Sequence, residues 1–461
     1  MRAQLSVEGA ATRLEGLLLF LRREVKAGLN EAVRVMGRDG RPRLGRIVAM
    51  DEAFLTLEVM DAVAGLTLPE VRVAFSGRRL GFALGPGLLG RVFNGVGEVI
   101  DGGPPIPAVR TYDIDGLAFN PLARQTPRDF IETGISSIDI LNSLVRGQKL
   151  PVFSAGGLPH DRLALDIAVN GRLRGAGARD FAIVFVGIGI PHDSAAYFRQ
   201  GLEESGALDR MVLFLNLASD SSVQRLLTPR FALTAAEYLA FEEGRHVLVI
   251  LSDLTNYCEA LREVSTSLGE IPGRKGYPGY LYSDLATLYE RAGCLAGRPG
   301  SLTQLPILTM PGEDIGHPIP DLTGYITEGQ IVLDRELDRA GIYPPVKVLP
   351  SLSRLMKDGT GDGYTHRDHP ALANQLYAAY AKAVQARVLA AVVGEDGVSE
   401  IDQRYLRFGR GFEAEFLAQE GRRTLEESMA LGWRLLGCLP RAEMNRLSDR
   451  QIGEHLGDDH G

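Results

Sequence analysis

The chain has 461 residues, of which 45% are hydrophobic and 23% are charged. These are ordinary globular proportions, and they exclude a disordered chain, a fibrous repeat and a small disulfide scaffold. The length predicts about three domains. The 50 Lys and Arg against 58 Asp and Glu give a net charge of −8, so no basic excess indicates a nucleic-acid partner. Three cysteines without CxxC spacing, and no apolar run of the ~20 residues that span a bilayer, predict a soluble protein with reduced thiols.

The first part of the chain, residues 1–75, has the pattern of short strands joined by turns. Leu55, Leu57 and Val59 alternate with polar residues, which is the period of a half-buried strand. Asp39 and the glycine after it stand between two apolar runs and predict a hairpin turn. We therefore expect a small β-barrel here.

The middle of the chain, residues 76–358, has continuous apolar runs alternating with helical patterns. Continuous runs are typical of parallel strands that are buried on both faces. Thr228 with the proline after it is expected to begin one of the helices, and Gly244 to end it. Strands that alternate with helices predict a doubly wound α/β domain. The expected strands lie at residues 151–153, 181–186, 212–217, 247–251 and 305–308.

The last part of the chain, residues 359–461, is expected to be a helical bundle. Asp368 is placed to open one helix and Gly394 to end it. Ser399 and Asp402 have the spacing of a capping box at the start of the next helix.

The most informative segment is LPVFSAGGLPHD, residues 150–161. A strand, a glycine-containing turn and a helix form the architecture of a phosphate-binding loop, in which backbone N–H groups face the phosphate. A working loop also needs a Lys for the phosphates and a Ser or Thr hydroxyl for Mg²⁺. The sequence is predicted to place Leu158 and Pro159 at these positions, and neither offers the required group. The candidate residues of this degenerate loop are Ser154, Gly156, Gly157, Leu158, Pro159 and Asp253.

Two further positions concern catalysis. Asp253 follows the apolar run at residues 247–251, where nucleotide hydrolases hold an acidic residue that orients Mg²⁺; a helix N-cap is the alternative role. After the run at 181–186, residues 187–193 contain no Glu that could polarise an attacking water. The loop cation and the water-activating acid are therefore both expected to be missing.

With their flanks, these residues resemble the B subunits of the V/A-type rotary ATPases. The resemblance runs from about residue 17 to residue 456. The sequences GLPH and PSLSRLM separate these subunits from the catalytic A subunits, which keep an intact phosphate loop, and from F-type subunits. The resemblance is densest at residues 89–106, 133–161, 228–242, 254–265, 272–293 and 317–359.

The resemblance implies a fold and an assembly. The fold would be an N-terminal β-barrel, a central P-loop-NTPase-like (RecA-like) α/β domain and a C-terminal helical domain. Three A and three B subunits would alternate in a ring around a central shaft, with peripheral stalk subunits, on the cytoplasmic face of the cell membrane. The chain itself would not touch the membrane. ATP or ADP with Mg²⁺ would lie at the A–B interfaces, with the Mg²⁺ held by the A subunits, and turnover would be coupled to ion transport, expected to be of protons.

The resemblance also implies roles for particular residues. Arg354, in PSLSR, matches an arginine that each B subunit lends across the interface to the catalytic site of its A neighbour. A guanidinium stays charged and can neutralise a transferring phosphoryl group. Arg274 and Lys275 lie in a loop, residues 271–280, that faces the central stalk in related rings. Arg230 and Glu237 are interface candidates for which structural pairing is the alternative, and no metal site is expected around His192.

This sequence departs from the family at residues 188–198, where members carry a polar, Glu-containing stretch, and at residues 154–157, where Ser-Gly-Ser-Gly is usual. Two alternatives to a non-catalytic ring subunit remain open. A self-sufficient hexameric motor ATPase would need a Lys in the phosphate loop, and Leu158 argues against it. A scaffold without a role in chemistry would not need Arg354.

Overall fold

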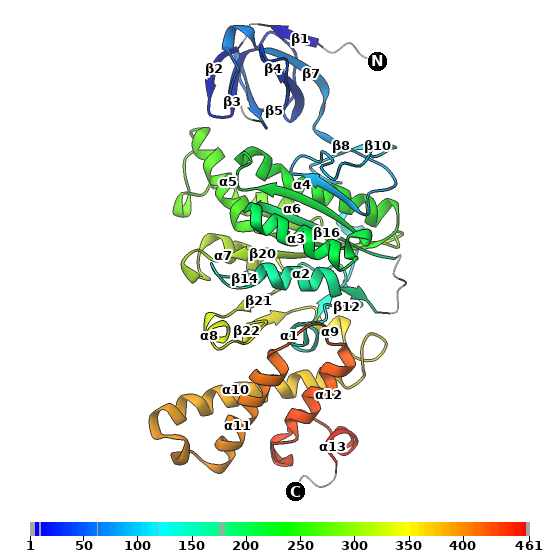
Figure 1. The fold of residues 1–461 in the computed structure, drawn as a ribbon, viewed down its shortest axis with the longest axis vertical. Coiled ribbons are helices and arrows are strands. Elements are labelled where there is room, and N and C mark those ends of the chain that lie inside the picture. The colour runs from blue at the N-terminus through cyan, green and yellow to red at the C-terminus, as the bar shows by residue number, and fades with distance from the viewer. Residues whose placement is uncertain are drawn as a thin grey trace.

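The computed structural model describes residues 5–8, 11–61, 63–117, 119–174, 177 and 180–457. Three parts follow one another along the long axis of the molecule (Figure 1): a β domain at the N-terminal end, an α/β domain in the middle and a helical domain at the C-terminal end. This arrangement confirms the predicted fold class.

The N-terminal domain is a seven-stranded sheet in the order β1-β7-β4-β5-β6-β3-β2. β4 and β5 pair antiparallel through a turn in which Gly40 has a φ of +65°, so the predicted hairpin is confirmed. β7 continues to Arg79, and the expected boundary at residue 75 falls inside this strand; the domain boundaries stay predictions. The strands are β1 Leu5–Glu8, β2 Ala11–Glu15, β3 Leu18–Arg22, β4 Glu31–Met36, β5 Pro42–Met50, β6 Phe54–Val59 and β7 Arg72–Arg79.

The central domain is built on a ten-stranded sheet, whose main path runs β22-β21-β14-β20-β18-β16-β17-β9. The neighbouring pairs from β21 to β9 are parallel, and β22 is an antiparallel strand at one edge. All five predicted strands are present. The strands are β9 Arg91–Asn94, β11 Arg124–Gln125, β14 Val152–Ser154, β16 Phe181–Ile190, β17 Met211–Leu217, β18 His246–Ser252, β19 Gly293–Leu295, β20 Ser301–Thr309, β21 Gly329–Leu333 and β22 Val346–Ser353.

Helices cover this sheet and bury two apolar cores against it. The helices are α1 Ser136–Leu141, α2 His160–Asn170, α3 His192–Glu204, α4 Ser222–Glu237, α5 Leu254–Ser267, α6 Leu281–Tyr289, α7 Pro318–Ile326, α8 Arg335–Arg339 and α9 Met356–Gly359. Short strands complete the domain: β8 Gly81–Leu84 pairs with β10 Arg110–Asp113, and β12 Phe130–Glu132 pairs with β13 Leu144–Val145 and β15 Arg172–Leu173.

The predicted start of a helix at Thr228 is wrong. α4 begins after Ser221, whose hydroxyl caps it by accepting from the Gln224 N–H, and Pro229 lies inside the helix. The Ser221 cap and the buried leucines of the first two turns stabilise an earlier start. The helix therefore tolerates a proline that removes one backbone hydrogen bond.

The C-terminal domain consists of α10 His369–Val393, α11 Glu400–Gly411, α12 Leu425–Leu436 and α13 Asp449–Leu456 around a third core. Asp368 precedes α10 and Gly394 follows it, as predicted. Ser399 caps α11 by accepting from the Asp402 N–H. The Asp402 carboxylate accepts from the Ser399 hydroxyl rather than from its backbone N–H, so only one bond of the predicted capping box forms.

α10 is 25 residues long, and by length and composition alone it is apolar enough to cross a membrane. Charged residues such as Lys382 and Arg387 interrupt its apolar run, so the sequence contains no continuous apolar stretch of that length here. One face of α10 packs in the core of the helical domain, including Leu372, Leu376 and Ala383.

Candidate functional site

The degenerate phosphate loop joins the end of β14, at Ser154, to the start of α2, at His160. Leu158 is only 5% exposed and packs in the core beneath the sheet. A phosphate loop has its Lys six residues after the first glycine position and its hydroxyl one residue later. Counted from Ser154, these positions are His160 and Asp161. The predicted assignment to Leu158 and Pro159 is therefore two residues too early.

The corrected positions still lack the groups that phosphoryl transfer needs. His160 Nδ1 lies 3.0 Å from the Ser154 hydroxyl, and the Asp161 carboxylate accepts from the Ser194 hydroxyl at 2.9 Å. Asp161 stands in the first turn of α2, where its negative charge already complements the positive end of the helix dipole. A phosphate at this end would meet a carboxylate instead of a magnesium-binding hydroxyl.

Arg335, which forms an ion pair with Glu313, holds the glycine turn of the loop. Arg335 donates from Nη2 to the Gly156 carbonyl at 2.7 Å and pairs through Nε with Glu313 at 2.6 Å. Gly157 has a φ of +82°, a backbone conformation that favours glycine. Gly156 and Gly157 are both exposed to solvent beside this pair. The loop's nearby arginine is thus neutralised by Glu313.

Asp253 has the structural role that the sequence left as the alternative. Its carboxylate caps α5, accepting from the Thr255 N–H at 2.8 Å and from the Thr309 N–H at 3.1 Å. Burial is the largest influence on its pKa and raises it. Because two backbone N–H groups already bind this buried carboxyl, its geometry supports a capping role and not the orientation of Mg²⁺. The residues of this loop do not fit a magnesium nucleotide, and we derive no reaction step here.

Arg354 follows the edge strand β22 and is differently placed. Its backbone N–H donates to the Glu328 carbonyl at 2.9 Å, and its Nη1 lies 3.4 Å from the Thr327 carbonyl. The side chain is exposed, and no carboxylate of the described chain forms an ion pair with it. Its positive charge is therefore available to a group outside this chain.

An open cavity of about 540 Å³ adjoins Arg354. Leu352, which is 51% exposed, and Met356 contribute apolar walls, and the Tyr377 hydroxyl bonds to the Leu349 carbonyl at 2.9 Å on the α10 side. The guanidinium thus stands at the rim of a largely apolar hollow on the surface.

The sheet separates Arg354 from the phosphate loop of its own chain. Ser353 pairs with Gly329, at the amino end of β21, whereas Val346 pairs with Leu333, at its carboxyl end. β21 runs parallel to β14, so the phosphate loop lies beyond the carboxyl ends of both. The rise along β21 between Gly329 and Leu333 is about 13 Å. Arg354 and the phosphate loop of the same chain therefore lie at opposite ends of these strands.

The two interface candidates on α4 lie inside the chain. Arg230 pairs with Asp284 at 2.9 Å and is 13% exposed. Glu237 is 3% exposed and receives two bonds from the guanidinium of Arg291, at 2.7 and 2.8 Å. Structural pairing, the alternative that the sequence left open, is therefore the role that the geometry of this chain supports, and the interface role stays a prediction. Sequence reasoning did not find Arg291, which is 54 residues from its partner.

The loop at residues 271–280 is exposed, but its charges are paired within the chain. Arg274 lies 3.1 Å from Asp321, and Lys275 lies 3.2 Å from Asp314. Both pairs are solvent-exposed, so they are weak and can exchange for partners on another protein. The contact with the central stalk stays a prediction.

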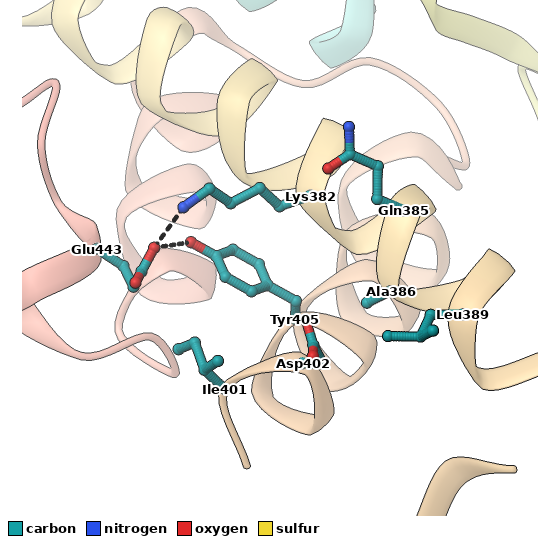
Figure 2. A pocket seen from close by; sticks show the side chains of 8 residues that line it. All are labelled: Lys382, Gln385, Ala386, Leu389, Ile401, Asp402, Tyr405 and Glu443. Atoms are coloured by element: carbon teal, nitrogen blue, oxygen red, sulfur yellow. Dashed lines mark hydrogen bonds and ion pairs between the residues drawn. The ribbon is translucent and has the colours of Figure 1, made fainter. Parts of the chain in front are cut away.

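Two other polar clusters are satisfied by their own residues. In a C-terminal cavity of about 370 Å³, Lys382 and the Tyr405 hydroxyl both point to the Glu443 carboxylate, each at 2.6 Å (Figure 2). Asp368 lies near Glu454 and His455 with spacing that could hold a metal ion. Arg450 already binds Asp368 at 2.6 Å, so the contacts of this cluster hold α13 to the start of α10.

The fold and the loop together define an α/β protein of the P-loop NTPase class whose own loop lacks the catalytic groups. Residues 134–353 match the ATP synthase alpha/beta family, nucleotide-binding domain, and residues 358–456 match the C-terminal domain of V and A type ATP synthase.

The chain is 53% identical over 444 residues to the V-type ATP synthase beta chain of Halothermothrix orenii, covering 96% of each. It is 50% identical over 450 residues to V-type ATP synthase beta chain 2 of Clostridium tetani, covering 97% of this chain and 98% of the relative. The solved structure of the ATP synthase subunit NeqB from Nanoarcheaum equitans matches with 40% identity and a TM-score of 0.73, over 91% of this chain and 98% of that one. The chain therefore belongs to the V-type ATP synthase beta chains, the B subunits of these complexes, as the resemblance predicted.

Proposed function

We propose that this chain is the non-catalytic B subunit of the soluble ring of a V/A-type ATP synthase and that it supplies Arg354 to the catalytic site of a neighbouring A subunit. The ring would contain three A and three B subunits in alternation. ATP or ADP with Mg²⁺ would be held mainly by the A subunits, at the A–B interfaces. Turnover there would be coupled to the transport of protons through a membrane sector.

The observation that carries this proposal is the position of Arg354. Its side chain is exposed, has no carboxylate partner in the described chain, and follows Ser353, which pairs with the amino end of β21, whereas the phosphate loop lies beyond the carboxyl end of β14. Arginines donated in trans stabilise the charge on a transferring phosphoryl group and contribute about 10³–10⁵ in rate. The open hollow beside Arg354 gives a neighbour's nucleotide site room to approach.

Other contacts follow from the same assembly. The loop at residues 271–280 would reach the central stalk through Arg274 and Lys275, and other surfaces would meet peripheral stalk subunits. The complex would lie on the cytoplasmic face of the cell membrane, with no direct contact between this chain and the bilayer.

The experiment is to measure ATP turnover by the purified chain by itself and by the chain assembled with its A partner. We expect negligible turnover from the lone chain, because the loop lacks a Lys and a hydroxyl, and strong turnover together. Turnover by the lone chain would instead identify a self-sufficient motor ATPase and would overturn the proposal.

A further inference from the structure

A second cavity, of about 460 Å³, lies near the amino ends of the parallel strands of the central sheet. It is lined by residues of β11, of the turn that leads into β12, and by Tyr364 of the segment before α10. β18 and β20 begin beside it, at His246 and Ser301. The phosphate loop lies beyond the other end of β20, about 25 Å away at the usual rise per residue. The cavity also shares no lining residue with the hollow beside Arg354.

Guanidinium groups dominate this cavity. Arg124, Arg128 and Arg146 line it, and Asp129 is the one carboxylate among the lining residues. Asp129 pairs with Arg146 at 2.6 Å. Arg124 donates to the backbone carbonyls of Ala292, at 2.8 Å, and of Glu290, and the Glu290 carboxylate approaches it at 3.6 Å from outside the lining. Positive charge is therefore in excess within the cavity itself.

Some of these donors have no acceptor. The Nε of Arg146 is buried and finds no hydrogen-bond partner in the described chain. Its Nη1 lies 3.4 Å from His246 Nε2, and burial together with the charge of Arg146 lowers the pKa of His246, so that the neutral ring can accept. Arg128 is exposed, and neither an ion pair nor a hydrogen bond to it occurs among the described residues. Buried donors without partners are uncommon, and a bound ion or an ordered water is one explanation for such a donor.

This situation contrasts with the cavity in Figure 2, where one carboxylate satisfies both the ammonium and the hydroxyl. We propose that the cavity lined by Arg124, Arg128 and Arg146 binds a small anion that carries phosphate groups. The planar fork of a guanidinium matches two phosphate oxygens at once. Thr126 and Tyr364, which also line the cavity, offer hydroxyl donors. The volume accommodates a diphosphate with its bound water.

The test is calorimetric titration of the full-length chain with pyrophosphate, without Mg²⁺ and at low salt. We expect saturable binding at one site per chain, weaker at higher ionic strength because salt screens the charges. Arg128→Ala should weaken binding at least tenfold, and Arg128→Lys should lose less because it keeps the charge without the fork. Parallel titrations with inorganic phosphate and ATP identify the source of the anion. If ATP also binds and Arg128→Ala weakens its binding by the same factor, the ligand is the phosphate chain of a nucleotide. If pyrophosphate binds and ATP does not, the ligand is a free inorganic anion.

The matched control is Arg335→Ala, which removes the cation beside the degenerate phosphate loop and should leave pyrophosphate binding unchanged. Arg128 is exposed, so its variants should fold, and the thermal unfolding midpoint of Arg128→Ala without ligand should equal that of the parent chain. The proposal is overturned by an absence of saturable binding, by binding that survives Arg128→Ala, or by binding that Arg335→Ala abolishes. Loss of pyrophosphate binding when the chain assembles with its A partner would also overturn it, because the arginines would then serve an acidic surface of the neighbour.

Discussion

Two corners of the central domain carry an arginine beside an opening, and they differ in how the charge is balanced. At the degenerate phosphate loop, Arg335 pairs with Glu313, and Asp161 occupies the start of α2. At the amino end of β21, the guanidinium of Arg354 has one hydrogen-bond contact within the described chain, at 3.4 Å from the Thr327 carbonyl, and no carboxylate partner. The phosphate loop has the strand–turn–helix architecture of a nucleotide site, but the charges around it are balanced by residues of the same chain. The region around Arg354 lacks this architecture, yet the positive charge of Arg354 has no carboxylate partner in the described chain.

The difference shows how to distinguish arginines that stabilise the fold of their own chain from arginines that are available to bind another subunit. An arginine with a carboxylate at hydrogen-bond distance contributes to the fold of its own chain. An exposed arginine held only by carbonyls keeps its full charge, and the guanidinium cannot lose its proton near neutral pH.

The buried pair of Glu237 and Arg291 should be essential to the fold rather than to an interface. Arg291→Ala leaves the Glu237 carboxylate buried without its partner, and we expect a loss of about 3–5 kcal/mol in the free energy of unfolding. Denaturant titration measures this loss. Arg434→Ala is the matched control, because Arg434 and Glu415 form an exposed pair worth at most about 1 kcal/mol. Equal, small losses in both variants would return Glu237 to the interface candidates.

Leu158 should behave as a core residue although it lies in the phosphate loop. Leu158→Ala removes buried side-chain atoms and leaves a cavity, so we expect a loss of about 2–5 kcal/mol, measured by denaturant unfolding. Leu352→Ala, at an exposed leucine beside Arg354, should cost less than about 1 kcal/mol. If both leucines gave the same small loss, the loop would not be packed against the core as described.

His369 should make the chain less stable in acid. It is buried at the start of α10, with Nε2 3.0 Å from the Ile140 carbonyl, and burial lowers its pKa to about 4. The unfolded chain takes up this proton near pH 6.5, so stability is fully present above that pH and is lost as the pH falls toward 4, by up to about 3 kcal/mol. His369→Gln should flatten the unfolding free energy between pH 6.5 and 4. An unchanged slope in this variant would assign the acid sensitivity to other groups.

Arg335→Ala should have the smallest effect. Its pair with Glu313 is partly exposed, so the loss in unfolding free energy should stay below about 1 kcal/mol. ATP turnover of the ring assembled with the A subunits should not change, because the degenerate loop takes no part in the chemistry. A large fall in turnover would mean that this corner still handles nucleotide and would remove the contrast between the two arginines.

The regular elements could be predicted because their residue patterns are local. The buried strands of the sheet are continuous apolar runs, and Asp368 and Gly394 bound α10 as turn and cap chemistry requires. The start of α4 could not be predicted in this way, because a proline inside a helix has the same local signature as a proline at its beginning. Only the packing of the first turns and the Ser221 cap decide between the two.

The site was less predictable than the fold. Reading the phosphate loop two residues too early was possible because the sequence does not show where the loop ends, and the buried side chain of Leu158 decides it. The partners of Arg230 and Glu237 come from distant segments, so the sequence could not say that these charges are used inside the chain. The cavity lined by Arg124 and Arg146 likewise forms only when separate segments meet.

The most direct test of the account is ATP turnover of the assembled ring carrying Arg354→Ala. Because Arg354 makes no ion pair within the described chain, the variant should fold and assemble as the parent does, which gel filtration and thermal unfolding would establish. Turnover should fall by about two or more orders of magnitude, as expected when a trans arginine is lost. A fully assembled Arg354→Ala ring with unchanged turnover would contradict the account and leave this chain as a structural partner only.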